Sequence, residues 1–487
     1  MLKHVTDYML YRWRYLIGYA VMVAAIGAVF YLVGLHVPGA LRQAELDSAI
    51  KSGSLSMETL EPSMVIDLPY HILQRVIFIL FGVSIVTIKL PSIIIATLTT
   101  IGIFLLVRTW FRRNVAIIAT ITAATSTQFL FLLQDGTPHI MYSFVTIWLL
   151  FASTYVTRNK AFSTLWKVMT GVLMATALYT PLGIYLVIAI LTTAFFHPHI
   201  RYTILRFSRP RLWIGIFLAL VSLTPLIYAA IIDRNVLFTL IGLPVGEIHL
   251  MRNLTEVVLD LFGYTAQSTT YFLRPAYSLG LFLLILVGVY KLITYKYTAR
   301  SYIALILGLV MAPLVLLNPE RLYDLFPLAC LMIALGVATL ITDWYKLFPR
   351  NPYARIAGLV PLGVLIVGIV YSGVIRFTGN YLYNGAILSH YSTDVRHLRH
   401  ALAANQASPT TTKLVVAKEE VAFYALMAHY DKRFTVTQIG NPVSAPVTIL
   451  SHNAYRLAKP TTEPTQIVSN RMTENSDRFY IYKTASK

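Results

Sequence analysis

The chain of 487 residues is poor in charge and almost free of cysteine. Charged residues make up 13% of it, about half the share of an ordinary soluble domain. The one cysteine, Cys330, lies inside an apolar run, which excludes a disulfide within the chain and a metal site built on several cysteines. Acidic residues are scarcer than basic ones, 21 against 40, so each carboxylate beside an apolar segment becomes a candidate functional group.

Long apolar runs dominate the sequence, and hydrophobic residues reach 57%. The runs are continuous rather than alternating, which indicates helices and not the strands of a barrel. About 20 helical residues cross the hydrocarbon core of a bilayer. The first run is full length and no small-residue cleavage pattern follows it, so we do not expect a cleaved signal. We predict a mainly α polytopic membrane protein whose eleven transmembrane helices cover 13–34, 90–107, 115–133, 139–157, 165–180, 182–197, 212–231, 277–295, 301–317, 322–342 and 355–376.

Basic residues gather in short segments between these runs, which accounts for the net charge of +19. Such segments orient a membrane protein and attract anionic lipids, so we expect membrane lipids and no nucleic acid as partners. They alternate along the chain with the long, basic-poor segments 35–89 and 232–276. By the positive-inside rule the N-terminus is cytoplasmic, and an odd number of spans puts the C-terminus outside the plasma membrane. The basic segments are Lys3–Arg14, Arg108–Arg113, Arg158–Lys167, Arg201–Arg211, Lys291–Arg300 and Lys346–Arg355.

The last hundred residues have a different pattern, polar and rich in short elements. We predict a transmembrane domain over 1–377 and a small extracytoplasmic α/β domain over 378–487. No catalytic motif is evident in the second domain. Its strands are expected at Lys413–Ala417, Phe434–Gln438, Val447–Leu450 and Arg478–Tyr482, and its helices at Asp394–Ala404 and Glu419–His429.

The first external loop contains two acidic candidates on a predicted interfacial helix, 38–51. Glu45 and Asp47 are about 200° apart around a helix, so they do not share one pocket. Asp47 precedes Lys51 by four residues, which also fits a simple surface ion pair. Glu45 follows Arg42 by three residues and has the same ordinary explanation. Spacing alone leaves both readings open.

Other polar candidates lie at the predicted membrane boundary. Asp67 and His71 precede a second short apolar helix, 72–86, where Asp67 could simply cap the helix. Asp135 and His139 lie in a tight turn between two spans, where Asp-Gly is an ordinary turn pair. Arg321 begins a late span, where it could extend toward the interface or bind a phosphate with two hydrogen bonds.

The order of short motifs along the chain is informative. After the loop with Glu45 come Phe81-Gly82, Leu90-Pro91-Ser92, Arg108-Thr109-Trp110-Phe111, Ala123-Ala124-Thr125-Ser126 and Gln134-Asp135-Gly136-Thr137-Pro138-His139. This series resembles the C-type glycosyltransferases that use polyprenyl-phosphate sugars, such as the protein O-mannosyltransferases and the lipid A aminoarabinose transferases. The similarity is dense over 35–157, thin over 158–310, and returns at Arg321-Leu322-Tyr323 with Phe326-Pro327.

The sequence also departs from that family's pattern. Where the family carries Asp-Glu in the first loop, this chain has Ala44-Glu45. The His-Pro-Pro motif corresponds to Asp67-Leu68-Pro69. The turn between spans keeps Asp135 and Pro138 but lacks both arginines of the family's pattern.

The resemblance implies an inverting transfer of a sugar from a polyprenyl-phosphate donor to an acceptor on the extracytoplasmic face. Such a reaction needs a carboxylate to accept the acceptor's proton and positive charge to stabilise the leaving phosphate. We expect Glu45 to be the base, with Asp47 as the alternative, and Asp135 to orient the acceptor or a bound cation. The expected substrate-binding residues are Asp67, His71, His139, Arg321 and Tyr323.

Neither the cofactor nor the acceptor follows from the sequence. No motif requires a cofactor, although a divalent cation is compatible with the oxygen and histidine ligands present. The acceptor could be a protein, a lipid or a cell-wall glycan. Two other functions fit many spans: a non-catalytic relative that binds lipid-linked glycans, and a transporter or flippase. Internal repeats and polar residues at the midplane would favour a transporter, but here the charges concentrate at the ends of the spans.

Overall fold

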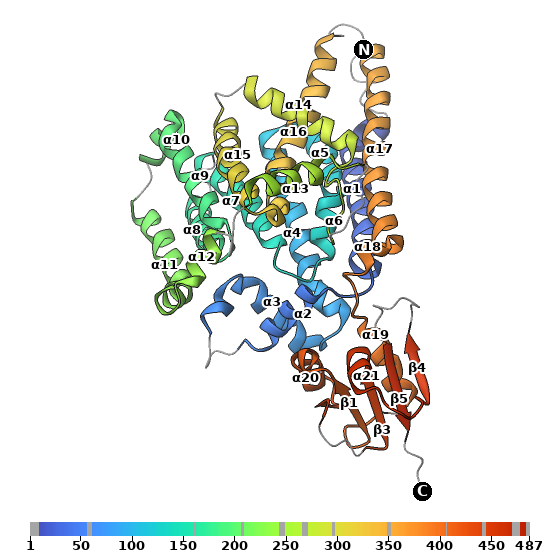
Figure 1. The fold of residues 1–487 in the computed structure, drawn as a ribbon. Coiled ribbons are helices and arrows are strands. Elements are labelled where there is room, and N and C mark those ends of the chain that lie inside the picture. The colour runs from blue at the N-terminus through green and yellow to red at the C-terminus, as the bar shows by residue number, and fades with distance from the viewer. Residues whose placement is uncertain are drawn as a thin grey trace.

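A computed structural model describes residues 9–55, 61–158, 162–205, 209–242, 249–264, 271–294, 298–347, 352–405, 407–440, 445–469 and 478–483. It has a helical membrane body and a smaller sheet domain at the end opposite the N-terminus (Figure 1). The predicted fold class, a polytopic α-helical membrane protein with a small C-terminal α/β domain, is confirmed.

The number of spans is smaller than the predicted eleven. Within the described residues, seven helical stretches are long and apolar enough to cross a membrane, and two bent helix pairs raise the number to nine at most. The long stretches involve α1 (Met9–His36), α4 (Ile85–Trp110), α7 (Ile140–Arg158), α11 (Arg209–Ile232), α15 (Ala299–Leu317), η3 with α16 (Pro319–Leu325 and Phe326–Leu347) and α17 (Pro352–Tyr383).

Local breaks and short helices explain the difference. The predicted span 115–133 is two helices, α5 (Arg113–Ala124) and α6 (Thr127–Gln134), bent by 63° where the Ser126 side chain caps α6. The α9 helix (Gly183–Phe196) meets α10 (Pro198–Leu205) at 90°. The remaining two, α8 (Ser163–Leu178) and α14 (Leu279–Thr294), have 16 residues each. At 1.5 Å per residue they measure about 24 Å, less than the bilayer core.

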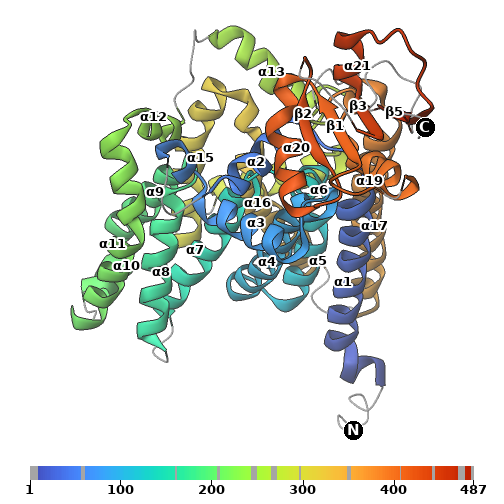
Figure 2. The same cartoon turned by 90° about the horizontal axis from the view of Figure 1, so that it is seen from below.

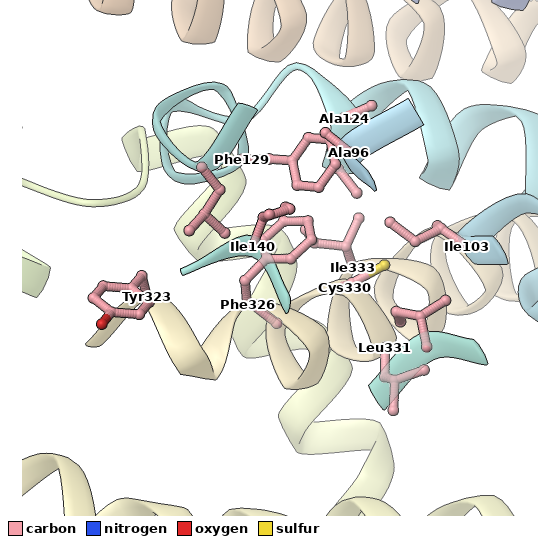
Figure 3. Close-up of a cluster of buried hydrophobic side chains, with 14 of the residues drawn as sticks. Ala96, Ile103, Ala124, Phe129, Ile140, Tyr323, Phe326, Cys330, Leu331 and Ile333 are labelled. Atoms are coloured by element: carbon pink, nitrogen blue, oxygen red, sulfur yellow. The ribbon is translucent and has the colours of Figure 1, made fainter. Parts of the chain in front are cut away.

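Close packing of helices forms the interior of the membrane body. Phe129 of α6 stacks on Phe326 of α16 with ring centroids 4.8 Å apart, beside the buried Cys330 (Figure 3). Gly288 brings α14 against α16, because a Cβ there would collide with the backbone carbonyl of Met332. This core packs α6 and α14 against α16, and the polar groups described below lie on α4, at the end of α6 and on the segment that precedes α16.

The long loop between α1 and α4 folds into short helices between the membrane body and the C-terminal domain (Figure 1), and α2 and α3 lie near α20 in the view from below (Figure 2). They are α2 (Gln43–Gly53), η2 (Pro62–Val65) and α3 (Leu68–Phe81). Further short helices elsewhere are α12 (Asn235–Ile241), α13 (Leu250–Phe262) and α18 (Gly385–Leu388).

The C-terminal domain is a mixed five-stranded sheet in the order β2-β1-β3-β5-β4. The β1 strand pairs in parallel with β2 and β3, while β5 runs antiparallel to β3 and β4. All six predicted elements of this domain are confirmed within two residues, whereas α21 and β4 were not predicted. The elements are α19 (Val395–Ala404), β1 (Thr412–Val416), η4 (Lys418–Glu420), α20 (Val421–Tyr430), β2 (Thr435–Gln438), β3 (Val447–Ser451), α21 (His452–Ala458), β4 (Gln466–Ser469) and β5 (Arg478–Lys483).

The C-terminal domain shares a hydrophobic core with the first loop. Leu46 of α2 and Ile88 of α4 belong to the same buried cluster as Leu398 and Met427 of the sheet domain. Leu41 also pairs with Thr393 through two backbone hydrogen bonds of 2.9 and 3.3 Å. The α17 helix continues to Tyr383, beyond the domain boundary expected after residue 377. The C-terminal domain therefore covers the first loop and packs against it.

Candidate active site

Glu45 is fully buried and joins the first loop to the turn between α6 and α7. One carboxylate oxygen, Oε2, accepts from the backbone N–H of Arg42 at 2.7 Å and so caps the start of α2. The other, Oε1, accepts from the backbone N–H of Gly136 at 2.7 Å. A Cβ at residue 136 would lie 2.8 Å from Ile88, so glycine permits this approach. Lys89 Nζ lies 3.6 Å from Glu45 Oε1 and provides the countercharge.

Asp135 lies beside Glu45 and is also fully buried. Arg42 Nη2 donates to its Oδ1 at 2.7 Å. Its Oδ2 accepts from the Thr137 hydroxyl at 2.5 Å and lies 2.9 Å from His139 Nδ1. The structure therefore brings together Glu45 and Asp135, two of the predicted catalytic residues, from segments 90 positions apart in the sequence.

Two cations complete this group, and neither was predicted. The Arg42 guanidinium lies 3.9 Å from the Tyr271 ring centroid, a cation–π contact that fixes its plane. Lys89 donates to Gln134 Oε1 at 3.0 Å, and Gln134 donates in turn to the Tyr391 hydroxyl at 3.1 Å. We call Arg42, Glu45, Lys89 and Asp135 the Glu45 cluster. Lys89 had a usable signal, because a lysine at the start of an apolar span is costly without a purpose.

The two carboxylates of the Glu45 cluster have opposite pKa shifts. Burial raises the pKa of Glu45, and the neighbouring Asp135 adds to this, while Lys89 opposes it. Burial also opposes ionisation of Asp135, but Arg42 and His139 outweigh it and hold the pKa of Asp135 below its usual range. Carboxylates with separated pKa values are suited to different roles, one accepting a proton and the other remaining charged.

A second buried group surrounds Asp67, at the start of α3. Its backbone is left-handed, with φ of 56°, and its N–H donates to the Tyr179 carbonyl at 2.8 Å. Within the described residues its Oδ1 has no hydrogen-bond partner. Burial raises the pKa of Asp67 to about 7, although Arg321 and Lys51 favour its charged form. A strained backbone and an unpaired buried carboxylate together are typical of a ligand site.

Arg321 and Tyr323, two predicted substrate-binding residues, lie in this second group on η3. Arg321 Nη1 donates to the Tyr323 hydroxyl at 3.3 Å and lies 3.8 Å from the buried Asp324. The His139 and Tyr323 rings are 4.3 Å apart, which connects this group to Asp135. We call Asp67, Arg321, Tyr323 and Asp324 the Asp67 cluster.

Two other predicted site residues, His71 and Asp47, belong to neither cluster. The His71 Nδ1 is 2.7 Å from the Ser52 hydroxyl, a contact between α3 and α2, and burial lowers the pKa of His71 to about 3. Asp47 is exposed on α2 and accepts from Gln43 at 2.9 Å, not from Lys51. The structure thus places His71 in a packing contact and Asp47 on the surface, away from the Glu45 cluster. Across the described residues, no group of three or more His, Cys, Asp or Glu has an arrangement suited to a metal ion.

Comparison with known proteins supports the fold. The dolichyl-phosphate-mannose-protein mannosyltransferase family matches residues 69–228, which include Lys89 and the Asp135 turn. ArnT from Cupriavidus metallidurans in the apo state, a lipid A aminoarabinose transferase, superimposes with a TM-score of 0.54 at 15% identity, over 96% of this chain and 98% of that one. This chain has the fold of the C-type glycosyltransferases. The predicted resemblance is confirmed.

The same ArnT bound to undecaprenyl phosphate superimposes with a TM-score of 0.55 at 14% identity, over 95% of this chain and 97% of that one. Among curated protein sequences, none matches this chain. The C-type fold therefore extends over the whole chain, including the C-terminal domain, while the family match begins after the loop that carries Glu45.

Proposed function

We propose that this protein is an inverting glycosyltransferase, which moves a sugar from a polyprenyl-phosphate donor to an acceptor on the extracytoplasmic side of the plasma membrane. The observation that carries the proposal is the Glu45 cluster: two buried carboxylates with separated pKa values, each paired with a cation. The C-type fold and the family match support the same reaction class.

In the proposed reaction Glu45 is the general base. The acceptor hydroxyl oxygen attacks the anomeric carbon and its proton passes to the Glu45 carboxylate. The bond between that carbon and the phosphate oxygen breaks, and polyprenyl phosphate leaves with the electron pair. The raised pKa of Glu45 suits it to accept a proton.

Arg42 and Lys89 would stabilise the negative charge that develops on the leaving phosphate. Both are buried, where charge–charge interactions are stronger than in water. Asp135 stays ionised, holds Arg42 at 2.7 Å and thereby positions it. Charged groups held in place before the reaction need little rearrangement in the transition state.

The Asp67 cluster would bind the donor sugar. The Asp67 and Asp324 carboxylates can accept from sugar hydroxyls, and Arg321 can donate to them or to the phosphate. His139 lies between the two clusters, where the sugar meets the phosphate. A divalent cation remains an untested option, and the acceptor remains open among protein, lipid and cell-wall glycan.

The test is turnover of radiolabelled polyprenyl-phosphate sugars by the purified full-length protein in nanodiscs. Glu45→Gln and Asp135→Asn should abolish transfer, and the exposed Asp47→Asn is the matched control. Wild-type rates in folded Glu45→Gln would overturn the proposal. Tight donor binding without turnover would instead indicate a glycolipid-binding protein, and an absence of binding a transporter.

A further inference from the structure

A separate cavity lies far from both clusters, between four helix segments. Its volume is about 240 Å³, and it is lined by the end of α4, the end of α14, the beginning of α15 and the middle of α16. Trp110 of its wall and Lys89 of the Glu45 cluster are at opposite ends of α4. Twenty-one helical residues separate them, which is about 32 Å, the thickness of a bilayer core. The cavity therefore lies at the membrane face opposite the C-terminal domain.

The polar wall of this cavity is positively charged. Lys291 and Arg300 line it, and none of its described lining residues is acidic. Arg300 Nη1 donates to the Trp110 carbonyl at 2.5 Å, and its guanidinium lies 4.9 Å from the Phe111 ring centroid. These contacts fix the guanidinium at the cavity wall. The first turn of α15 lies at the same wall, and its helix dipole adds positive potential.

The rest of the lining is largely apolar and includes Ala304, one turn beyond Arg300 on α15, and Leu335 of α16. A ligand that fits both parts of this lining carries an anionic group next to a hydrocarbon part. The α14 helix, at about 24 Å, is shorter than the hydrocarbon core, which places Lys291 in its last turn at the boundary of the hydrocarbon. Beside it Tyr290 and Ile293 are 71% and 62% exposed, as expected of side chains in contact with lipid.

From this geometry we propose that the cavity binds one anionic membrane lipid, with its phosphate between Lys291 and Arg300 and an acyl chain along Ala304 and Leu335. The positive charge of the cavity and its position at the membrane boundary favour a lipid over a soluble anion as the ligand. The site is independent of the proposed transfer reaction, because it is on the other side of the membrane body. Its occupation would hold the short α14 against α15 and α16.

Native mass spectrometry of the full-length protein tests the proposal. The protein is titrated with phosphatidylglycerol, and with phosphatidylcholine of the same acyl chains. We expect one preferential site for phosphatidylglycerol, weakened roughly fivefold by Lys291→Gln, since each basic residue near an anionic lipid contributes on that order. Lys346→Gln is the matched control. It removes an exposed cation in the last turn of α16 that does not line the cavity, so it should leave lipid binding unchanged.

A second variant tests the cavity itself without changing its charge. Ala304→Phe fills the space and should abolish preferential binding, while the elution volume on size exclusion shows whether the protein remains folded. Equal affinity for the two lipids, or unchanged phosphatidylglycerol binding in both Lys291→Gln and Ala304→Phe, would overturn the proposal. Competition by millimolar inorganic phosphate in the absence of a lipid preference would assign the site to a free anion and also overturn it.

Discussion

The Glu45 cluster and the Asp67 cluster are neighbours, yet they satisfy their charges differently. In the Glu45 cluster each carboxylate accepts hydrogen bonds at both oxygens and pairs with a cation. In the Asp67 cluster, Asp67 Oδ1 and Asp324 Oδ2 have no hydrogen-bond partner among the described residues. Carboxylates that accept hydrogen bonds at both oxygens are held in place before substrate binds, whereas carboxylate oxygens without partners favour a ligand that donates to them. This difference is consistent with our proposal that the Glu45 cluster carries out the chemistry and that the Asp67 cluster binds the sugar.

The largest expected effect comes from removing the base in the Glu45 cluster. Glu45→Gln keeps the shape and the cap of α2 but cannot accept a proton, so kcat should fall about a thousandfold, within the range for general-base catalysis. Release of polyprenyl phosphate from a radiolabelled donor measures it. The exposed Asp47→Asn should retain full kcat. A comparable loss in Asp47→Asn would show that the two carboxylates are not distinguished by burial.

Breaking a charge pair in the Glu45 cluster should reduce stability. Arg42→Met leaves Asp135 buried without its cation, which costs about 3–5 kcal/mol of the free energy of unfolding. Thermal unfolding in detergent micelles measures the change. Arg433→Met is the matched control, because it removes an exposed Arg–Asp pair with the same 2.7 Å separation and should cost at most about 1 kcal/mol. Equal losses in the two variants would contradict the importance of burial.

In the Asp67 cluster the corresponding change should affect binding. Asp67→Asn removes a charge-assisted hydrogen bond to the sugar, so the donor KM should rise about tenfold while kcat changes little. Steady-state kinetics with varied donor concentration separates the two constants. A fall in kcat with an unchanged KM would assign Asp67 to the chemical step.

A further expected effect is the pH dependence of stability. Because the folded-state pKa of Asp67 is about 7, above that of an unfolded aspartate, the folded state favours its protonated form. The stabilisation that the protonated Asp67 side chain gives the folded state is therefore fully present below about pH 4 and is lost as the pH rises through 7. Asp67→Asn should become more stable relative to the wild type across that interval, as measured by melting temperature. A difference independent of pH would contradict the raised pKa.

Prediction from the sequence succeeded where local pattern decides the structure. Strands β1, β3 and β5 were predicted correctly because each is a short run of consecutive apolar or aromatic residues, which is buried on both faces of the sheet. The β4 strand was missed because it is a short, exposed edge strand with little apolar periodicity. The predicted count of eleven spans is not confirmed, because hydropathy does not separate full-length spans from the bent pairs or from the 16-residue helices α8 and α14.

The sequence predicted the carboxylates of the Glu45 cluster but not its cations. Glu45 and Asp135 were chosen through a family resemblance, and the structure places them together. Arg42 was interpreted as a surface partner of Glu45, yet its guanidinium binds Asp135, and Lys89 was not considered. Asp47 and Glu45 differ by two positions on one helix, and helix rotation alone separates the exposed residue from the buried one.

The sequence by itself determined that the chain has the apolar helices of a membrane protein and that a sheet domain follows the last of them. These properties depend on hydropathy, charge and short-range periodicity, all of which are local along the chain. Only the tertiary structure decided which carboxylates are buried, which cations neutralise them, and that the C-terminal domain covers the first loop. Those outcomes depend on contacts between segments far apart in the sequence, such as Gln134 with Tyr391, which are 257 residues apart. Such contacts are determined when the apolar faces of α2, α4 and α20 are buried together in one core.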